Sequence, residues 1–195
     1  MAESAPARWT VDEFFAWQER QPDRHELVDG RPLRMMAGAR KAHNDVVINV
    51  LREFSLRLRG SSCSPFNGDS AVETGPGQIR RPDAGIDCGP NHPSALMARN
   101  PRVVVEVLSP NTRDFDTYKK AEEYRLVDGL QRILLIDPNR AEVVMWSREA
   151  GGWAEALVSG LDAEIAMPEV GIVLPLGEIY RDIAFPAELR LVLGE

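Results

Sequence analysis

The chain has 195 residues, of which 23 are Lys or Arg and 30 are Asp or Glu, so its net charge is −7. Hydrophobic residues make up 44% of it and charged residues 27%, which excludes a disordered, collagen-like or disulfide-scaffold protein. Apolar runs reach only about five residues, too few for a membrane span, and residues 1–10 lack the apolar core of a secretory signal. We expect one cytoplasmic domain over residues 1–195, with a core at about 10–148 and a β-rich C-terminal extension at about 149–195.

The N-terminal part of the sequence predicts a helix, a hairpin and a second helix. Thr10 and Glu13 form a capping-box pattern at the start of a short helix over about 11–17. Asp29-Gly30 between two apolar runs predicts a β-hairpin, because both turn positions need a positive φ. Apolar residues recur at helical spacing from about 41 to 59, which predicts a long helix that Gly60 ends.

The rest of the chain predicts mainly strands. Two are expected at about 63–72 and 78–87, joined by Gly75-Pro76-Gly77. Residues 103–108 are apolar on both faces and predict a central strand. The remaining expected elements are a helix at about 113–127, a buried strand at 133–136, strands at 142–146 and near Trp153, and a helical turn at 176–183. This order predicts an α/β fold with a mixed central β-sheet flanked by helices.

Cys63 and Cys88 are the two cysteines of the chain. They form no CxxC motif, and no histidine cluster stands near them at metal-ligand spacing. Because nothing in the sequence directs the chain to an oxidising compartment, we expect both to be reduced thiols.

Positive charge gathers in residues 31–60, which carry +5, whereas residues 141–195 carry −7. An acidic protein is not an obvious polyanion binder, but a local basic face can still be one. Two interpretations stay open: the arginines cover the solvent side of a helix, or they contact phosphates. If Arg52, Arg57 and Arg59 contact phosphates, binding weakens steeply with salt.

Glu106 lies inside an apolar strand, where an ionised carboxylate is costly unless it is paired or binds a metal. Two explanations stay open: a buried salt bridge to Arg81 or Arg102, or a role as metal ligand or catalytic acid/base. Asp83 follows Pro82 at the start of the preceding strand, and by itself it is also explained as a turn cap. If the two strands pair, both carboxylates reach one cation, and their oxygens suit Mg²⁺.

The helix after this strand carries Asp116, Lys120 and Tyr124 at i, i+4 and i+8, and therefore on one face. One interpretation is a surface pair of Asp116 with Lys120. The other is that Lys120 points at the two carboxylates, where its ammonium orients a water or offsets the charge of a phosphorane. Lys119 lies about 100° away and neighbours Glu122 and Glu123 three and four positions on, which suits a solvated ion pair.

Several short pieces of the sequence resemble one nuclease family when they are taken together and in order. They are His25-Glu26-Leu27-Val28-Asp29-Gly30, His43, Arg81-Pro82-Asp83, residues 104–112, the face of Asp116, Lys120 and Tyr124, and Leu135-Ile136-Asp137-Pro138. Over about residues 10–180 the chain resembles the PD-(D/E)XK nuclease superfamily and, more closely, the bacterial Uma-type family of restriction endonucleases.

The resemblance implies a restriction-endonuclease-like core and a Mg²⁺-dependent endonuclease that hydrolyses phosphodiester bonds of DNA, with Mn²⁺ as an expected substitute. It carries over Asp83 and Glu106 as metal ligands and catalytic residues, Glu26 as a catalytic accessory acid and Lys120 as the active-site lysine. The expected substrate-binding residues are Arg52, Arg57, Arg59 and Arg81, and the candidate accessory groups are His43 and Tyr124. Glu26 is also explained as a solvent-facing hairpin residue, and His43 as a partly buried, hydrogen-bonded histidine.

The sequence departs from these patterns at two places. The superfamily's lysine stands two residues after the glutamate, where this chain has Leu108, and Lys120 fits the Uma-type pattern with the lysine on the next helix. The family also places an acid and two aromatic residues after the closing glycine of that helix, whereas residues 130–133 are Leu-Gln-Arg-Ile.

Three functions are compatible with the sequence. The first is a metal-dependent DNA endonuclease, the second an inactive nuclease fold that binds nucleic acid or protein, and the third a metal-dependent hydrolase of a smaller phosphate ester. Cutting both strands of a duplex with one site per chain favours a homodimer. Residues 187–193 alternate in polarity and are expected to form a strand that adds to a partner's sheet edge.

Overall fold

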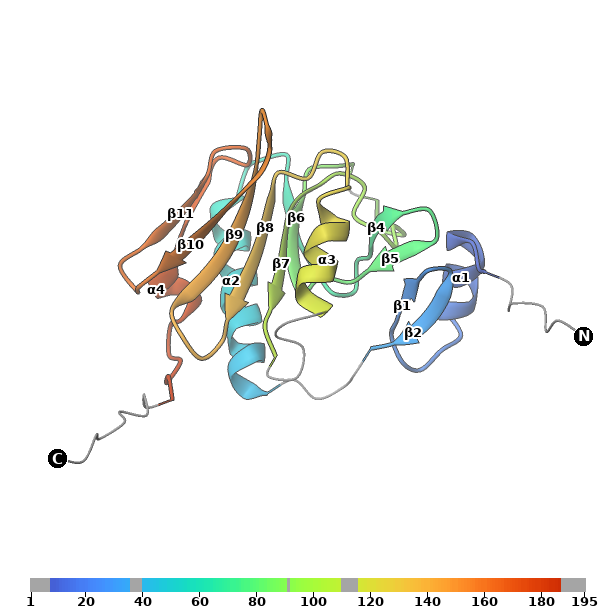
Figure 1. Ribbon diagram of the computed structural model, residues 1–195, viewed down its shortest axis with the longest axis horizontal. Helices are drawn as coiled ribbons and strands as arrows, with labels where there is room; N and C mark the ends of the chain where they lie inside the picture. Colours follow the sequence, from blue (N-terminus) through green and yellow to red (C-terminus); the bar gives the residue numbers. More distant parts are fainter. Residues whose placement is uncertain (1–7, 36–39, 91, 110–115, 187–195) are drawn as a thin grey trace, which may run out of the picture.

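The computed structural model of the protein describes residues 8–35, 40–90, 92–109 and 116–186 (Figure 1). In chain order the elements are α1 (Val11–Gln18), β1 (His25–Val28), β2 (Arg31–Arg34), α2 (Lys41–Arg57), β3 (Ser64–Asn67), β4 (Val72–Gly75), β5 (Gln78–Arg80), β6 (Ala84–Asp87), β7 (Pro101–Val107), α3 (Asp116–Tyr124), β8 (Arg132–Asp137), β9 (Glu142–Glu149), β10 (Gly152–Ser159), β11 (Glu164–Met167), β12 (Ile172–Pro175) and α4 (Leu176–Ile179). The predicted α/β class with a mixed sheet is confirmed.

The N-terminal part forms a lobe around a four-stranded antiparallel sheet in the order β2-β1-β5-β4. The predicted capping box at Thr10 and Glu13 is present at the start of α1. Asp29 and Gly30 have φ values of 50° and 72°, as the predicted hairpin turn requires. Phe14 packs with Leu27 in the apolar cluster that joins α1 to the lobe's sheet.

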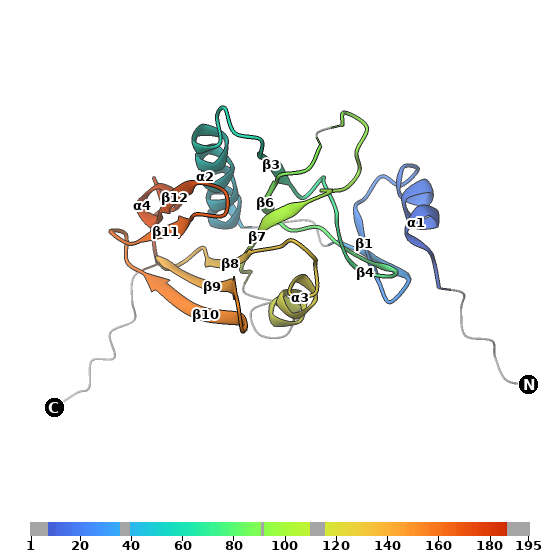
Figure 2. The ribbon, with the colours of Figure 1, turned by 90° about the horizontal axis from the view of Figure 1, so that it is seen from above.

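The second sheet has six strands in the order β10-β9-β8-β7-β6-β3. Its strand β7 pairs antiparallel with β6 and parallel with β8, and α3 makes the crossover between β7 and β8. Alternate residues of β7 face opposite sides: Val103, Val105 and Val107 face one apolar core, and Val104 faces the other. Figure 2 shows α2 on one side of this sheet and α3 on the other.

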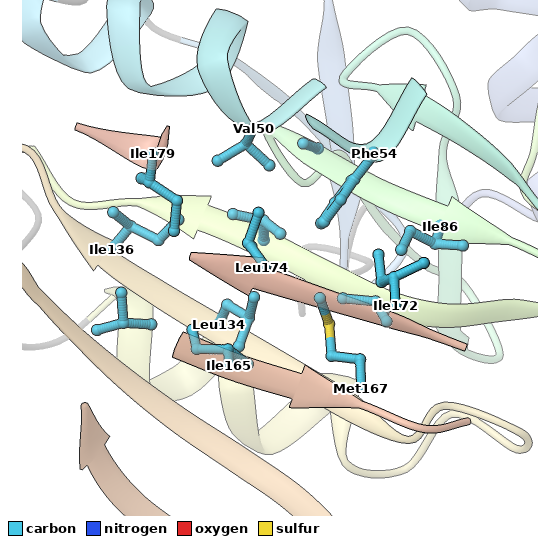
Figure 3. Close-up of a cluster of buried hydrophobic side chains, with 14 of the residues drawn as sticks. Val50, Phe54, Ile86, Leu134, Ile136, Ile165, Met167, Ile172, Leu174 and Ile179 are labelled. Carbon is cyan, nitrogen blue, oxygen red and sulfur yellow. The ribbon is translucent and has the colours of Figure 1, made fainter. Parts of the chain in front are cut away.

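The larger core lies between the six-stranded sheet, α2 and the C-terminal elements (Figure 3). Val50 and Phe54 of α2 meet Leu134 and Ile136 of β8 in this core. Ile165, Met167, Leu174 and Ile179, from β11, β12 and α4, complete it. β11, β12 and α4 are therefore part of the main core, because they cover one face of the sheet, whereas β10 is its edge strand.

The two long strands predicted at about 63–72 and 78–87 are each divided, and this part of the prediction is wrong. The turn after Asn67 separates β3 from β4, and residues 81–83 separate β5 from β6. The halves join different sheets: β3 and β6 enter the six-stranded sheet, and β4 and β5 enter the lobe. Pro82 has no N–H to donate to a sheet, which explains why the chain changes sheets beside it.

Cys63 and Cys88 form a disulfide with a Cα–Cα distance of 4.0 Å, so the expectation of reduced thiols is wrong. The register of β3 against β6 pairs Ser64 with Asp87. One residue beyond that pair, the two cysteines stand opposite each other. This juxtaposition depends on strand pairing across 25 residues, which cysteine spacing does not reveal.

Two predicted features fall on residues that are not described. The strand predicted at 187–193, and with it the proposed addition to a partner's sheet, lies outside the described residues, as do residues 113–115 of the predicted third helix. Within the described ranges, no helix combines the length and the apolar character that a membrane crossing requires.

Reduction of the disulfide is expected to destabilise the fold. Opening a crosslink with a sequence separation of 25 should lower the free energy of unfolding by about 3.5 kcal/mol, the loop-entropy value for that length. Urea unfolding with and without a phosphine reductant measures this change. The double variant Cys63→Ser, Cys88→Ser is the control and should not respond to the reductant; an equal midpoint for the parent under both conditions would contradict the prediction.

Candidate active site

The two predicted metal-ligand carboxylates lie on neighbouring strands. Asp83 directly precedes β6, and β6 pairs with β7 so that Ala84 lies opposite Val105. One step further along this register, Asp83 lies opposite Glu106. The backbone N–H of Val107 donates a 2.7 Å hydrogen bond to Oδ2 of Asp83, which fixes this carboxylate beside the C-terminal end of β7.

Glu106 is buried, with 8% of its surface exposed. It follows the alternation of β7 onto the face of Val104, where α3 packs. The hydroxyl of Tyr124 donates a 2.8 Å hydrogen bond to Oε1 of Glu106, and Nζ of Lys120 lies 3.4 Å from the same oxygen. The buried carboxylate therefore takes its partners from α3.

The two arginines considered as partners of Glu106 bind backbone carbonyls elsewhere, so the explanation by an arginine salt bridge is wrong, and the ion pair of Glu106 is with Lys120. Arg81 donates to the carbonyls of His25, Gly68 and Asp69. Arg102 donates to the carbonyl of Gly129 at 2.9 Å.

Glu26 is also buried, with 5% exposure, so the solvent-facing explanation is wrong. Its Oε1 lies 3.0 Å from Nζ of Lys120 and accepts a 3.1 Å hydrogen bond from the backbone N–H of Arg81. Its Oε2 accepts a 2.9 Å hydrogen bond from Arg80. The lobe thus brings an acid from β1 to the same lysine that contacts Glu106.

Lys120 and Lys119 point in different directions, as their helical spacing requires. The side chain of Lys120 is 20% exposed and lies between Glu26 and Glu106, whereas Lys119 is exposed. The side chain of Asp116, the predicted partner of Lys120, lies outside the part of the structure that is described. Among the described residues, the ion pairs of Lys120 therefore come from Glu26 of the lobe and Glu106 of β7.

His43 lies in the first turn of α2, with Nε2 3.3 Å from Oδ2 of Asp83. The hydrogen bond to Asp83 raises the pKa of His43, and the Asp83 and Glu106 charges add to the rise although burial opposes it. His43 is thus the partly buried, hydrogen-bonded histidine that one interpretation expected, and its partner is a site carboxylate.

Burial and charge give the two buried acids opposite properties. Burial raises the pKa of Glu106 to about 7, although Lys120 lowers it and Asp83 adds to the rise. For Glu26, burial also raises the pKa, but Lys120 and Arg80 outweigh it, so the pKa is lowered. Glu26 is therefore ionised at neutral pH, whereas Glu106 changes protonation near it.

Lys120 and Tyr124, the two site residues on α3, keep their usual protonation states at neutral pH. Burial lowers the pKa of Lys120, but the Glu106 and Glu26 carboxylates outweigh it and raise the pKa above its ordinary value. Burial, together with the Glu106 and Glu26 charges, raises the pKa of the Tyr124 hydroxyl well above its ordinary value. Lys120 is accordingly an ammonium and Tyr124 a hydrogen-bond donor.

Arg80 and Glu123 belong to the site, and the sequence analysis did not identify them. Arg80 binds Glu123 through Nε at 2.6 Å and through its NH2 nitrogen at 2.7 Å. The expected solvated pair of Lys119 with Glu123 is therefore wrong, because α3 turns Glu123 toward the lobe. The expected pair of Lys119 with Glu122 stays a prediction. The only hint in the sequence was that Arg80 directly precedes the Arg81-Pro82-Asp83 motif. Its burial, which the sequence does not reveal, distinguishes it from a surface arginine.

The predicted substrate-binding arginines do not gather around the carboxylates. Arg52 and Arg57 both contact Glu53 on α2, and Arg52 also contacts Glu178. Arg57 lies 14 residues after His43, or roughly 21 Å along the helix axis. Arg59 is exposed beyond the end of α2, and Arg81, although next to the site, is buried against backbone carbonyls.

Comparison with known proteins identifies relatives of the chain. The chain is 29% identical over 186 residues to the uncharacterized protein slr1290 of Synechocystis sp., and the alignment covers 93% of this chain and 97% of that protein. It is 26% identical over 132 residues to the uncharacterized protein sll1609 of the same organism, covering 66% of this chain and 74% of that protein.

A solved structure has the same fold. The crystal structure of a putative nuclease belonging to DUF820 from Anabaena variabilis matches with a TM-score of 0.69 and 17% identity, covering 88% of this chain and 97% of that chain. The model of the Uma2 family, described as putative restriction endonucleases, matches residues 11–177. The match covers most of the chain and agrees with the resemblance in the sequence, and the chain therefore belongs to the Uma2 family.

Proposed function

We propose that the protein is a Mg²⁺-dependent endonuclease that hydrolyses phosphodiester bonds of DNA. The observation that carries the proposal is the convergence of Asp83, Glu106, Glu26 and Lys120 from four different segments onto one site. Membership of the Uma2 family and the nuclease described for the structural relative support the same reaction class.

The two carboxylates fit a divalent cation. Within the described residues, all hydrogen bonds and ion pairs to this pair fall on Oδ2 of Asp83 and Oε1 of Glu106. The second oxygen of each carboxylate has no donor in that part of the chain. For Glu106, which is buried, an oxygen without a partner is costly, whereas the Asp83 side chain is 25% exposed. The described residues form no cluster of three or more such ligands, but Mg²⁺ typically uses only one or two protein carboxylates together with water.

The chain's own groups have distinct tasks in this reaction. Asp83 and Glu106 would hold the cation, which when bound lowers the pKa of water and offsets phosphate charge. Water attacks phosphorus, one P–O ester bond breaks, and the leaving oxygen gains a proton as the water loses one. The Lys120 ammonium stabilises the negative charge that develops on the phosphoryl oxygens. Glu26 and Tyr124 hold Lys120 and Glu106 in position.

The proposal includes a homodimer acting on duplex DNA in the cytoplasm, with one site for each strand. Binding of DNA phosphates by Arg52, Arg57, Arg59 and Arg81 is part of the same proposal. Arg52 and Arg57 are paired with acids on α2 and α4, Arg59 lies beyond the end of α2, and Arg81 binds backbone carbonyls. The support for the proposal therefore comes from the carboxylates and Lys120.

A second candidate function is an inactive nuclease fold that binds nucleic acid or protein. The replacement of the family's acid and aromatics at residues 130–133 favours it. There, Arg132 turns away from the site and forms a bidentate pair with Glu169. The cleavage experiment below separates the two candidates.

Cleavage should require a divalent cation and both carboxylates. Purified protein should nick plasmid DNA with Mg²⁺ or Mn²⁺ and stop when a chelator is added. Asp83→Asn and Glu106→Gln, which keep the side-chain shape, should lower the rate by roughly 10²-fold or more while far-ultraviolet circular dichroism stays unchanged. Glu155→Gln, an exposed acid on β10, is the control. If both site variants cut like the parent, the proposed site is wrong.

Lys120 and Lys119 should differ sharply. Lys120→Ala removes the ammonium beside Glu106 and should reduce the cleavage rate by roughly 10²-fold or more. It should leave cation affinity, measured by calorimetry, nearly unchanged because lysine is not a ligand. Lys119→Ala should cost little. Equal losses, or the reverse ranking, would exclude Lys120 as the active-site lysine.

Stability without metal should depend on pH through Glu106. Its pKa rises from 4.5 to about 7, so the folded protein binds more protons than the unfolded chain in this window. The free energy of unfolding should therefore fall as pH rises through it, by on the order of 3 kcal/mol. Urea unfolding in chelator at about pH 5 and about pH 8 should show a larger loss in the parent than in Glu106→Gln, which keeps the contribution of His43, whose pKa is also raised. The same loss in both proteins would assign it to another group.

A further inference from the structure

A chain of five buried or half-buried charged side chains joins the lobe to the six-stranded sheet. In order it runs Glu123, Arg80, Glu26, Lys120 and Glu106. Arg80 and Glu26 come from the lobe's sheet, Glu123 and Lys120 from α3, and Glu106 from β7. We call these five residues the charge chain.

Arg80 links two acids of the charge chain, Glu123 and Glu26. Its Nε and NH2 nitrogens bind the two oxygens of Glu123 at 2.6 and 2.7 Å, and its NH1 nitrogen binds Oε2 of Glu26 at 2.9 Å. The side chain of Arg80 is only 5% exposed. A planar guanidinium can serve two carboxylates in this way, whereas a lysine ammonium lacks the fork geometry.

The position of Lys120 depends on this arrangement. Arg80 takes Oε2 of Glu26, so that Oε1 faces Lys120 at 3.0 Å, and Lys120 stays 3.4 Å from Glu106. Without Arg80, Glu26 keeps Lys120 as its only charged partner among the described residues. Besides Lys120, only the backbone N–H of Arg81, which donates to Oε1, then holds the Glu26 carboxylate among the described residues. We expect the loss of the anchor on Oε2 to shift the carboxylate and, with it, the ammonium relative to Glu106.

We propose that Arg80, clamped by Glu123, is a positioning residue that acts through Glu26 to hold the Lys120 ammonium at the reacting phosphate. The inference rests on the proposed nuclease function for its kinetic part. A gain in stability does not by itself explain why Arg80 is buried between two acids, because a buried ion pair often contributes little net stabilisation over apolar residues of similar size.

The chain contains a matched control for this proposal. Arg132 and Glu169 form a second bidentate pair, with both distances 2.9 Å and side-chain exposures of 11% and 15%. Arg132 faces the core on the α2 side of the sheet, together with Leu134 and Ile136. Arg132→Gln and Glu169→Gln should lower the free energy of unfolding by a similar amount without changing the position of Lys120.

The spectroscopic test needs neither DNA nor metal. Lys41, Lys119 and Lys120 are the three lysines of the chain, so labelling lysine with ¹⁵N gives three Nζ signals, and Lys120→Ala assigns one of them. Arg80→Gln and the milder Glu123→Gln should move the Lys120 signal while Lys41 and Lys119 stay in place. Arg132→Gln and Glu169→Gln should move none. An unmoved Lys120 signal in both site variants would overturn the proposal.

The kinetic test uses plasmid cleavage with Mg²⁺. Arg80→Gln and Glu123→Gln should lower kcat by roughly tenfold or more while KM changes by less than about twofold. Arg80→Lys keeps the charge but should not restore kcat, and full recovery by it would overturn the role of the fork. Loss of kcat in the Arg132 and Glu169 variants of equal size would show a stability effect only. If the parent cuts no DNA, the nuclease function fails, and the Lys120 signal still decides the positioning role.

Discussion

The buried carboxylate of Glu106 is the constraint on which the rest of the site depends. An acid in an apolar strand costs several kcal/mol unless donors or a cation meet it. Tyr124 and Lys120 supply donors from α3, but both engage the same oxygen. Its second oxygen has no donor among the described residues, and burial raises the pKa of Glu106 to about 7. The apolar strand β7 thus holds an acid whose charge only α3 offsets in part.

The fold supplies these donors through an ordinary structural device. Strands β7 and β8 are parallel, so the chain must cross over between them, and α3 is the helix that does so. The crossover places α3 on the face of β7 that carries Val104 and Glu106. On the opposite face, α2 and the C-terminal β11, β12 and α4 bury the other residues of β7. Both faces of β7 are therefore largely covered, and the low exposure of Glu106 strengthens its interactions with nearby charges.

The lobe adds a second set of charges that a single sheet does not offer. Glu26 and Arg80 enter from β1 and β5, and each contacts α3. The charge chain alternates three acids with two cations, so that each buried charge has an opposite charge beside it, which reduces the cost of burial. Because Lys120 is shared between Glu26 and Glu106, any shift of the lobe relative to β7 changes the position of the ammonium. The lobe is in this sense part of the site.

The sequence by itself determined the features that depend on neighbours along the chain. It identified the α1 capping box, the Asp29-Gly30 turn, the strand around Glu106 and the helix register that separates Lys120 from Lys119, because caps, turns and periodicity act over a few residues. The tertiary structure alone decided how β3 to β6 divide between two sheets, that Cys63 pairs with Cys88, and that Arg80 joins Glu26 and Glu123 across 54 and 43 positions. These contacts depend on strand order and register, and burial turns a charge that looks solvated in the sequence into one that must find a partner.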